Sequence, residues 1–433
     1  MKVNLPKLTA NSLFCASWFR RQRKVFWISA SLCWLVLSAP VSAAIVGEFT
    51  NISSSSEQII SLRHQEHFWE SDDGAQHLLI NAGTDNQSSS LTLLTRLADN
   101  DTWVESFTLP NTGANANADS LLRDQQLHMV YGDTDGAINY AVATYDANTQ
   151  AWSTPDTSVV YSDPDAVLLS WAPTLTFDSD NTAYVGFYVR NIETQKSWLQ
   201  MSFSQTPLGD WQDSTQTWGT VNKFTGKSAR VTTVNGRVGL LYTNQFRGGW
   251  QRVATMNWSQ PDLGESVTGQ WVSEELHREQ TSIFKKDADP YGSHFNVVGS
   301  DDGDLHLIWA FDERAHYLHY EGDTQVWGSI SNLLDNQYKT TYVQISRHAD
   351  GGLYPVFNVG SSLIVMESLD NGANFDVKAL LRHSANEGED WSHPRIETPS
   401  VFSGSLDILQ QVSITNAAET YQLLYHFQYN PAP

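Results

Sequence analysis

The feature that most constrains this chain is a short apolar motif that occurs seven times. Each copy follows a turn rich in Asp, Gly or Asn, runs for about five residues and usually ends in an aromatic side chain. The copies are Gln76–Ile80, Leu127–Tyr131, Ala183–Phe187, Val238–Tyr242, Leu305–Trp309, Leu353–Phe357 and Tyr421–Tyr425. Successive copies start about 50 to 70 residues apart, and each follows another strand-like run. Such a period is typical of architectures built from one repeated supersecondary unit.

Further strand signals surround these copies. Most copies are followed by a third strand-like run, a tight polar turn and a Trp or Phe, as at 100–103 and 208–211. Four antiparallel strands repeated around an axis form the blades of a β-propeller, and no useful stretch shows helical periodicity. The sequence therefore predicts an all-β fold, a seven-bladed β-propeller of four-stranded antiparallel blades. Six blades are the alternative, and would require one copy to be accidental.

The N-terminal region has the pattern of a secretory signal. A basic stretch at 20–24 precedes an apolar run from Val25 to about Pro40, and small residues precede Ala44. This order of segments predicts a signal peptide over residues 1–43, cleaved after Ala43. The apolar run is shorter than the roughly 20 residues that a membrane span needs, so no membrane span is expected after cleavage. An uncleaved N-terminal anchor is the alternative.

The composition expected after cleavage argues against a disulfide-bonded protein and against bulk binding to nucleic acid or membranes. The leader holds both cysteines and six of the 26 basic residues, which leaves a mature chain without disulfides and with a formal charge of about −28. A chain this acidic repels nucleic acid and membranes in bulk. We expect a monomer that is secreted or periplasmic in a bacterium. Residues 44–433 are predicted to form a single propeller domain, and the spare strand 45–51 is expected to pair into the last blade, which removes an exposed edge.

Aligning the copies places candidate site residues at one rim of the propeller. The first strand of each blade is expected to line the axis. Counting eleven residues back from the start of a motif predicts the residue at which this first strand begins. The residues so placed are Trp171 (beside Ala172), Lys227, His294 and Tyr342. Loops after the second strands are expected to face the same rim with Arg190, Arg247, His316 and Asn358. Cations, histidines and a phenol around one opening of an acidic protein indicate an anionic ligand.

Two stretches of the chain resemble known propeller families. The segment 368–375 (SLDNGANF) matches the Asp-box turn of sialidase-like (BNR repeat) propellers. The segment from Ser293 to Tyr320, with His294 and His316, resembles the repeat of propeller polysaccharide lyases, the ulvan lyases in particular. The blade that begins Thr341-Tyr342 resembles the Tyr blade of that family, with Asn358 at the place where the family carries an Arg.

The resemblance implies a polysaccharide lyase that cleaves an anionic, uronic-acid-containing polysaccharide by β-elimination. His294 would be the base and Tyr342 the acid, or the reverse, and His316 would orient them. Arg247, Arg190 or Lys227 would neutralise the carboxylate of the substrate, which acidifies the proton at C5. No spacing is a metal signature, so no metal ligand is assigned. A divalent cation such as Ca²⁺ or Zn²⁺ could assist through Asp289 or Asp312.

Two other classes of function stay open. A sialidase-like hydrolase would need an early Arg-Ile-Pro signature, and Pro394-Arg395-Ile396-Glu397 is a late and imperfect version of it. A carbohydrate-binding propeller without catalysis is the other class, although lectin propellers usually repeat one site in every blade. The histidines that share one strand position, His77, His128 and His306, are expected to be packing residues.

Overall fold

A computed structural model describes most of the chain after residue 44. The described residues are 45–48, 59–60, 62, 64–82, 90–98, 100, 102–112, 116–165, 167–222, 228–248, 251–262, 267–282, 295–311, 314–334, 340, 342–359, 362–382, 390–415 and 420–431. The predicted signal peptide and its cleavage site lie outside them. No helix in the described ranges is long and apolar enough to cross a membrane.

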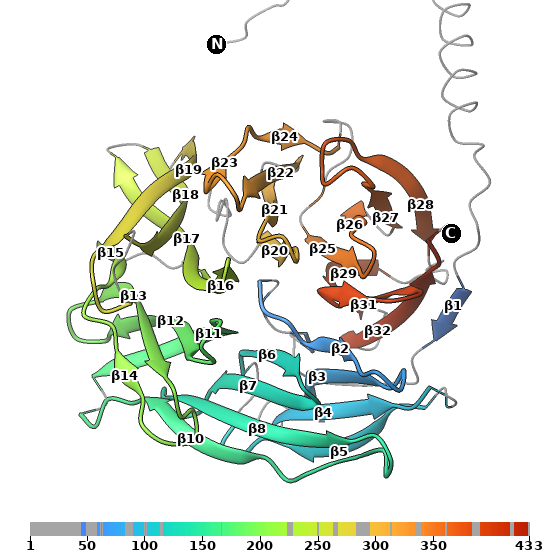
Figure 1. Cartoon of the computed structure of the whole chain (residues 1–433), viewed down its shortest axis with the longest axis horizontal. Helices are drawn as coiled ribbons and strands as arrows, with labels where there is room; N and C mark the ends of the chain where they lie inside the picture. The colour runs from blue at the N-terminus through green and yellow to red at the C-terminus, as the bar shows by residue number, and fades with distance from the viewer. Residues whose placement is uncertain are drawn as a thin grey trace, which may run out of the picture. The chain divides into compact units, whose positions relative to one another are not determined.

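Seven antiparallel sheets of four or five strands follow one another in a ring (Figure 1). The prediction of an all-β propeller with seven blades, and not six, is thus confirmed. Blade one consists of β2 (Phe68–Glu70), β3 (Gln76–Ala82), β4 (Ser90–Arg96) and β5 (Val104–Thr108). Blade two consists of β6 (Ala118–Arg123), β7 (Gln126–Gly132), β8 (Ile138–Asp146) and β10 (Asp156–Tyr161), with β9 (Ala151–Trp152) also on β8. Blade three consists of β11 (Leu168–Phe177), β12 (Ala183–Asn191), β13 (Lys196–Ser204) and β14 (Gln212–Asp213), with β15 (Trp218–Asn222) also on β13.

The remaining blades repeat this plan. Blade four consists of β16 (Ala229–Val234), β17 (Arg237–Gly248), β18 (Gln251–Pro261) and β19 (Trp271–Ser282). Blade five consists of β20 (Phe295–Gly299), β21 (Leu305–Phe311), β22 (Arg314–Glu321) and β23 (Val326–Trp327), with β24 (Ser331–Asn332) also on β22. Blade six consists of β25 (Val343–His348), β26 (Leu353–Val359), β27 (Ser362–Glu367) and β28 (Asp376–Arg382), and β30 (Val401–Phe402) pairs with β25 in parallel. Blade seven consists of β29 (Asp390–Glu397), β31 (Leu406–Thr415), β32 (Thr420–Tyr429) and β1 (Ile45–Glu48).

The seventh blade contains strands from both ends of the described chain. β1 pairs with β32 in an antiparallel register that sets Ile45 opposite Gln428 and Glu48 opposite Tyr425. The seventh motif copy, Tyr421–Tyr425, was expected to be a second strand, and that expectation is wrong. It lies in β32, the third strand, because β31 occupies the second position. β31 carries the polar pair Gln410-Gln411 in its middle and lacks the short apolar run of the motif, so it was not recognised in the sequence.

Apolar side chains from neighbouring blades pack against each other and form the core. Between blades four and five, Leu241 and Trp258 pack with Phe295 and Trp309 in one buried cluster. Similar clusters fill the other interfaces between blades. Because both faces of a blade are covered, a strand such as β7 is almost wholly buried, and the burial of this apolar surface drives the ring to form.

The innermost strands are also joined by polar side chains. Bonds between a side chain and the backbone of the next blade cross six junctions: Asp119 with Glu66 N and with Leu175 N, Thr174 with Val231 N, Asn296 with Ile345 N, Gln344 with Ile396 O, and Glu397 with His67 N. Buried backbone groups that face the axis have no strand to pair with, so these side chains supply the partners that burial requires.

The Asp-box segment forms the turn between β27 and β28. The Asp370 carboxylate accepts hydrogen bonds from the Asn374 backbone N–H (2.9 Å) and from the Ser368 hydroxyl (2.8 Å). Gly372 has a φ of 85°, a conformation that favours glycine. Phe375 packs edge-on against Tyr317 of blade five at 4.9 Å between ring centroids. The segment 368–375 thus forms a tight turn in which Asp370 bonds the turn, Gly372 takes the positive φ and Phe375 packs against the neighbouring blade.

Candidate functional site at the propeller axis

Several predicted site residues lie outside what the structure describes. Lys227 and His294 precede β16 and β20 and are not among the described residues, nor are Asp289 and Asp312. Arg247 lies opposite Arg252 in the register of β17 and β18, and only its backbone is described. The roles proposed for Lys227, His294 and Arg247 therefore stay predictions.

Tyr342 and Asn358 lie together at the beginning of the innermost strand of blade six. The amide oxygen of Asn358 accepts a hydrogen bond from the Tyr342 backbone N–H at 2.8 Å, and Asn358 N donates to Tyr342 O at 3.3 Å. The Thr340 hydroxyl also donates to Tyr342 O at 3.1 Å. Asn358 thus fixes the backbone of Tyr342, and it lies within β26, not in a loop. We call this end of the propeller axis, where β25 begins, the mouth.

Arg395 of blade seven is close enough to Tyr342 for the two groups to interact electrostatically. Burial lowers the pKa of the Arg395 guanidinium, and the nearby Tyr342 phenol acts in the opposite direction. Arg395 Nη1 donates to the carbonyl of Ile60 at 2.8 Å, and the Ile60 N–H donates to Gln411 Oε1 at 3.0 Å. The Ile60 peptide is therefore held at both ends. Blade seven thus supplies a guanidinium that interacts with Tyr342. The sequence has Asn358 at the place where the lyases that it resembles carry an Arg.

His316 lies farther from the axis, on the third strand of blade five. Its ring stacks on Trp309 at 5.2 Å between centroids and lies 5.9 Å from the ring of His277 in β19. Arg314 and His316 belong to β22 and not to a loop. The side chain of His316 is buried between blades four and five, as expected for a residue that packs one blade on the next.

The two predicted ligand-binding residues of blade three also belong to strands. Trp171 of β11 lies opposite Tyr188 of β12, and their rings are 4.1 Å apart between centroids. Ala172 has a φ of 55° at the irregular register beside it. The Arg190 guanidinium donates to Gln195 Oε1. Among the described residues, Tyr342 and Asn358 are the predicted pair that the fold brings together.

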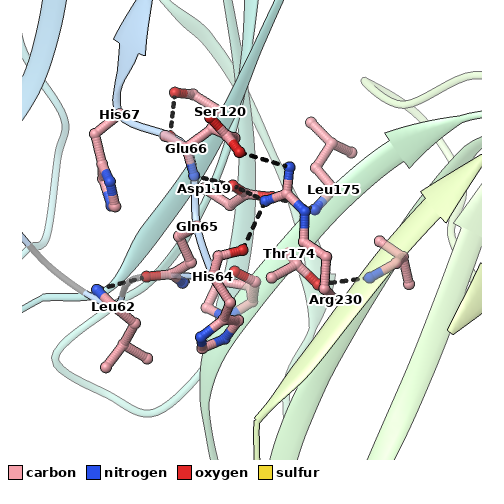
Figure 2. Close-up of polar contacts among 12 residues, drawn as sticks. Leu62, His64, Gln65, Glu66, His67, Asp119, Ser120, Thr174, Leu175 and Arg230 are labelled. Atoms are coloured by element: carbon pink, nitrogen blue, oxygen red, sulfur yellow. Dashed lines mark hydrogen bonds and ion pairs between the residues drawn. The ribbon is translucent and has the colours of Figure 1, made fainter. Parts of the chain in front are cut away.

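Sequence reasoning missed a buried cluster of charged residues at the axis (Figure 2). Arg230 Nη1 donates to Asp119 Oδ1 at 2.7 Å and to the carbonyl of His64 at 2.9 Å, and Arg230 Nη2 lies 3.5 Å from Glu66 Oε1. Glu397 accepts from the His67 backbone N–H at 3.0 Å and contacts His67 Nδ1 at 3.1 Å. We name the five side chains Glu66, His67, Asp119, Arg230 and Glu397 the axial cluster.

The segment 64–67 crosses the axis inside this cluster. The Glu66 carbonyl accepts from both the backbone N–H (3.0 Å) and the hydroxyl (2.8 Å) of Ser120. Gln65 Nε2 donates to the carbonyl of Pro173 at 2.7 Å. Together with the contacts to Arg230 and Glu397, these bonds tie the segment to the innermost strands of blades two, three, four and seven.

Burial and mutual charge shift the titration of the axial cluster. Burial raises the pKa of Glu66 to about 7, although Arg230 acts to lower it. Burial also raises the pKa of Asp119. At Asp119, Arg230 and the backbone N–H groups of Glu66 and Leu175 act against burial and favour the anion. Burial acts to lower the pKa of His67, but the surrounding carboxylates, Glu397 first, together raise it. For Glu66 and His67, the neutral carboxyl and the protonated imidazole are therefore favoured, as expected where carboxylates outnumber fixed cations.

The three histidines predicted to be packing residues are buried and bonded. His77 contacts Thr95 Oγ1 at 3.1 Å, His128 contacts the Tyr140 hydroxyl at 2.5 Å, and His306 contacts the Tyr317 hydroxyl at 2.8 Å. Burial lowers the pKa of each to about 4. These rings are neutral at physiological pH and act as packing groups.

A surface cavity of about 560 Å³ lies between blades five and six. It is lined by hairpin turns with Asp301, Asp302 and Asp350, and Arg347 at its side donates to Asp301 at 2.7 and 3.0 Å. Tyr342 precedes β25, whereas Arg347 lies near the other end of that strand, so the cavity is remote from the mouth. No group of His, Cys, Asp or Glu among the described residues is arranged to hold a metal ion.

No family model and no curated protein matches the sequence. Three solved structures are similar to the chain: the polysaccharide lyase Uly1 (TM-score 0.48, 11% identity, 92% of this chain and 95% of that chain), a lectin of Aleuria aurantia in complex with α-methyl-L-fucoside (0.44, 14%, 79% and 99%) and a sialidase of Trypanosoma rangeli (0.46, 12%, 79% and 59%). At this level of identity and overlap, none of the three assigns an activity or a ligand to this chain.

Proposed function

We propose that this protein is an exported polysaccharide lyase that binds an anionic polysaccharide at the mouth and cleaves it next to a uronic acid. The observation that carries the proposal is the electrostatic interaction between the Tyr342 phenol of blade six and the Arg395 guanidinium of blade seven. An acid–base group beside a cation is what β-elimination of a uronate requires.

Each group has a defined role in this reaction. Arg395 would neutralise the uronate carboxylate, and the C5 proton next to it becomes acidic enough to leave. Tyr342 or His294 takes that proton, the C4–C5 double bond forms as the C4–O bond breaks, and the other group returns a proton to the leaving oxygen. Arg230 is engaged by two carboxylates. We assign the substrate carboxylate to Arg395, because it is the guanidinium whose charge interacts with the Tyr342 phenol.

Binding without cleavage is a second candidate, and Asn358 favours it. Its amide fixes the Tyr342 backbone where the related family carries a cation, and the Tyr342 side chain is only 8% exposed. A propeller with this arrangement could hold an anionic saccharide and leave its bonds intact.

One assay separates these functions. The protein without residues 1–43 is incubated with ulvan, alginate and glycosaminoglycans, and the ultraviolet absorbance of unsaturated uronate is followed. A rise in absorbance supports the lyase. New reducing ends without absorbance would instead identify a hydrolase, and binding with neither signal would identify a lectin-like protein.

A further inference from the structure

The segment 64–67 is held at the axis by a cluster whose charges cannot all be compensated. Arg230 is the guanidinium of the axial cluster, and two carboxylates contact it. Asp119 is the closer, with Oδ1 2.7 Å from Arg230 Nη1, whereas Glu66 Oε1 lies 3.5 Å from Nη2. The third carboxylate, Glu397, is bound to His67.

Asp119 is bonded as an anion. Its two oxygens accept from Arg230 Nη1, from Glu66 N at 2.6 Å and from Leu175 N at 2.7 Å. Several donors on one carboxylate stabilise the charged form. Glu66 has the longer contact to the same guanidinium and is 2% exposed. A proton on Glu66 and a second on His67 would leave Arg230 and His67 balanced against Asp119 and Glu397.

We propose that Glu66 acts as a proton-dependent latch: its protonated form holds the segment 64–67 between the innermost strands, and its ionisation loosens that segment. The groups that face Glu66 are Arg230 of β16, Asp119 of β6, Glu397 of β29, the adjacent His67, and Ser400 between β29 and β30. The latch is independent of the proposed function, because it concerns how the ring is held and requires no saccharide.

The direction of the pH dependence follows from the shift of the Glu66 carboxyl. Its pKa is about 7 in the closed state and 4.5 in its ordinary environment. The closed state therefore binds the extra proton between these two values. The stabilisation of the closed segment by protonated Glu66 is fully present below about pH 4.5 and is lost as the pH rises to about 7. Because one proton is released on opening, the equilibrium constant for opening should rise about tenfold per pH unit between these two values. Above about pH 7 it should not change further.

Hydrogen exchange of the backbone amides tests the latch. Protection of a peptide that spans residues 62–68, corrected for the intrinsic dependence of exchange on pH, should fall about tenfold per unit between pH 5 and 7 and then level off. A peptide within β31 provides the internal reference for global unfolding. Constant protection of the wild-type segment from pH 5 to 7 overturns the proposal without recourse to a variant.

Two matched variants identify the responsible group. Glu66→Gln is an isostere of the protonated side chain and should keep the segment protected at pH 7. Glu70→Gln makes the same change at a residue whose pKa burial also raises to about 7, but whose charged neighbour is Asp407 rather than Arg230. It should keep the wild-type slope. An unchanged slope in Glu66→Gln, or its loss in Glu70→Gln, would assign the proton to another group.

Discussion

Arg230 and Asp119 join two blades that are not neighbours in the ring: Arg230 Nη1 of β16 in blade four lies 2.7 Å from Asp119 Oδ1 of β6 in blade two. Blade three lies between these two blades, and the Leu175 N–H of its innermost strand donates to the same carboxylate. A single buried carboxylate therefore links three blades.

Asp119→Ala should be among the most destabilising single changes in this protein. It leaves Arg230 buried without its closer carboxylate and removes the acceptor of two backbone N–H groups, so we expect a loss of about 3–5 kcal/mol in the free energy of unfolding. Urea unfolding measures the loss. The control is Glu275→Ala, which breaks the half-exposed pair with Arg278 and should cost about 1 kcal/mol or less. Equal losses in the two variants would mean that the axial contact contributes little.

Tyr342→Phe tests the catalytic assignment at the mouth. The ring is kept, so its packing with the buried residues of blades six and seven is preserved, and only the hydroxyl is lost. If Tyr342 transfers a proton, kcat for a uronate polymer should fall by about 10²–10⁴-fold while KM changes little. Tyr354→Phe removes another buried hydroxyl, bonded to Glu367 at 3.0 Å, and should leave kcat near the wild-type value. Full activity in Tyr342→Phe would exclude the phenol from the chemistry.

Acid should destabilise the propeller through its packing histidines. Burial lowers the pKa of His306 from 6.5 to about 4, so the unfolded chain binds the extra proton between these values. The stability that this histidine contributes is therefore present above about pH 6.5 and is lost as the pH falls toward 4, by up to about 1.4 kcal/mol per pH unit. His306→Gln should flatten the decrease in urea stability between pH 6.5 and 4.5. The same slope in variant and wild type would show that His306 does not titrate with unfolding.

Alanine substitutions at two glycines with positive φ can distinguish the cost of backbone strain from the cost of a steric clash. Gly372 in the Asp-box turn has a φ of 85°, and a Cβ placed there would lie 1.8 Å from the Tyr317 hydroxyl oxygen. Gly351 has a φ of 101°, and its Cβ would meet nothing within 4 Å. Gly351→Ala should cost about 1–2 kcal/mol of unfolding free energy from the backbone alone, and Gly372→Ala should cost clearly more. Equal melting temperatures for the two variants would show that Tyr317 moves aside freely.

The fold could be predicted because each blade repeats the same local pattern. Six motif copies, such as Leu127–Tyr131 and Leu305–Trp309, fall on second strands, and each of the seven copies lies in a different blade, so the number of copies gives the number of blades. The seventh copy falls one strand later. In β31 two buried glutamines, Gln410 and Gln411, follow Ile408 and Leu409, so this strand lacks the short apolar run by which the other second strands were recognised.

The axial cluster could not be predicted by the same means. Its members come from three blades and from the segment 64–67, and Glu66 and Glu397 are 331 positions apart in the chain. Only closure of the ring brings them together, and no local spacing records that contact. Arg230 follows the predicted rim residue Lys227 by three positions, so the count back from the motif reached the correct strand of blade four. It could not show which side chain of that strand enters the axis.

The pairing of β1 with β32 determines when the ring of blades can close during folding. The strand that starts the described chain lies opposite residues 425–428, so this early strand must stay without a partner until nearly all the rest has been synthesised. Contacts between such distant segments slow folding. For the proposed export this delay is an advantage, because the ring cannot close before its last strand has been released.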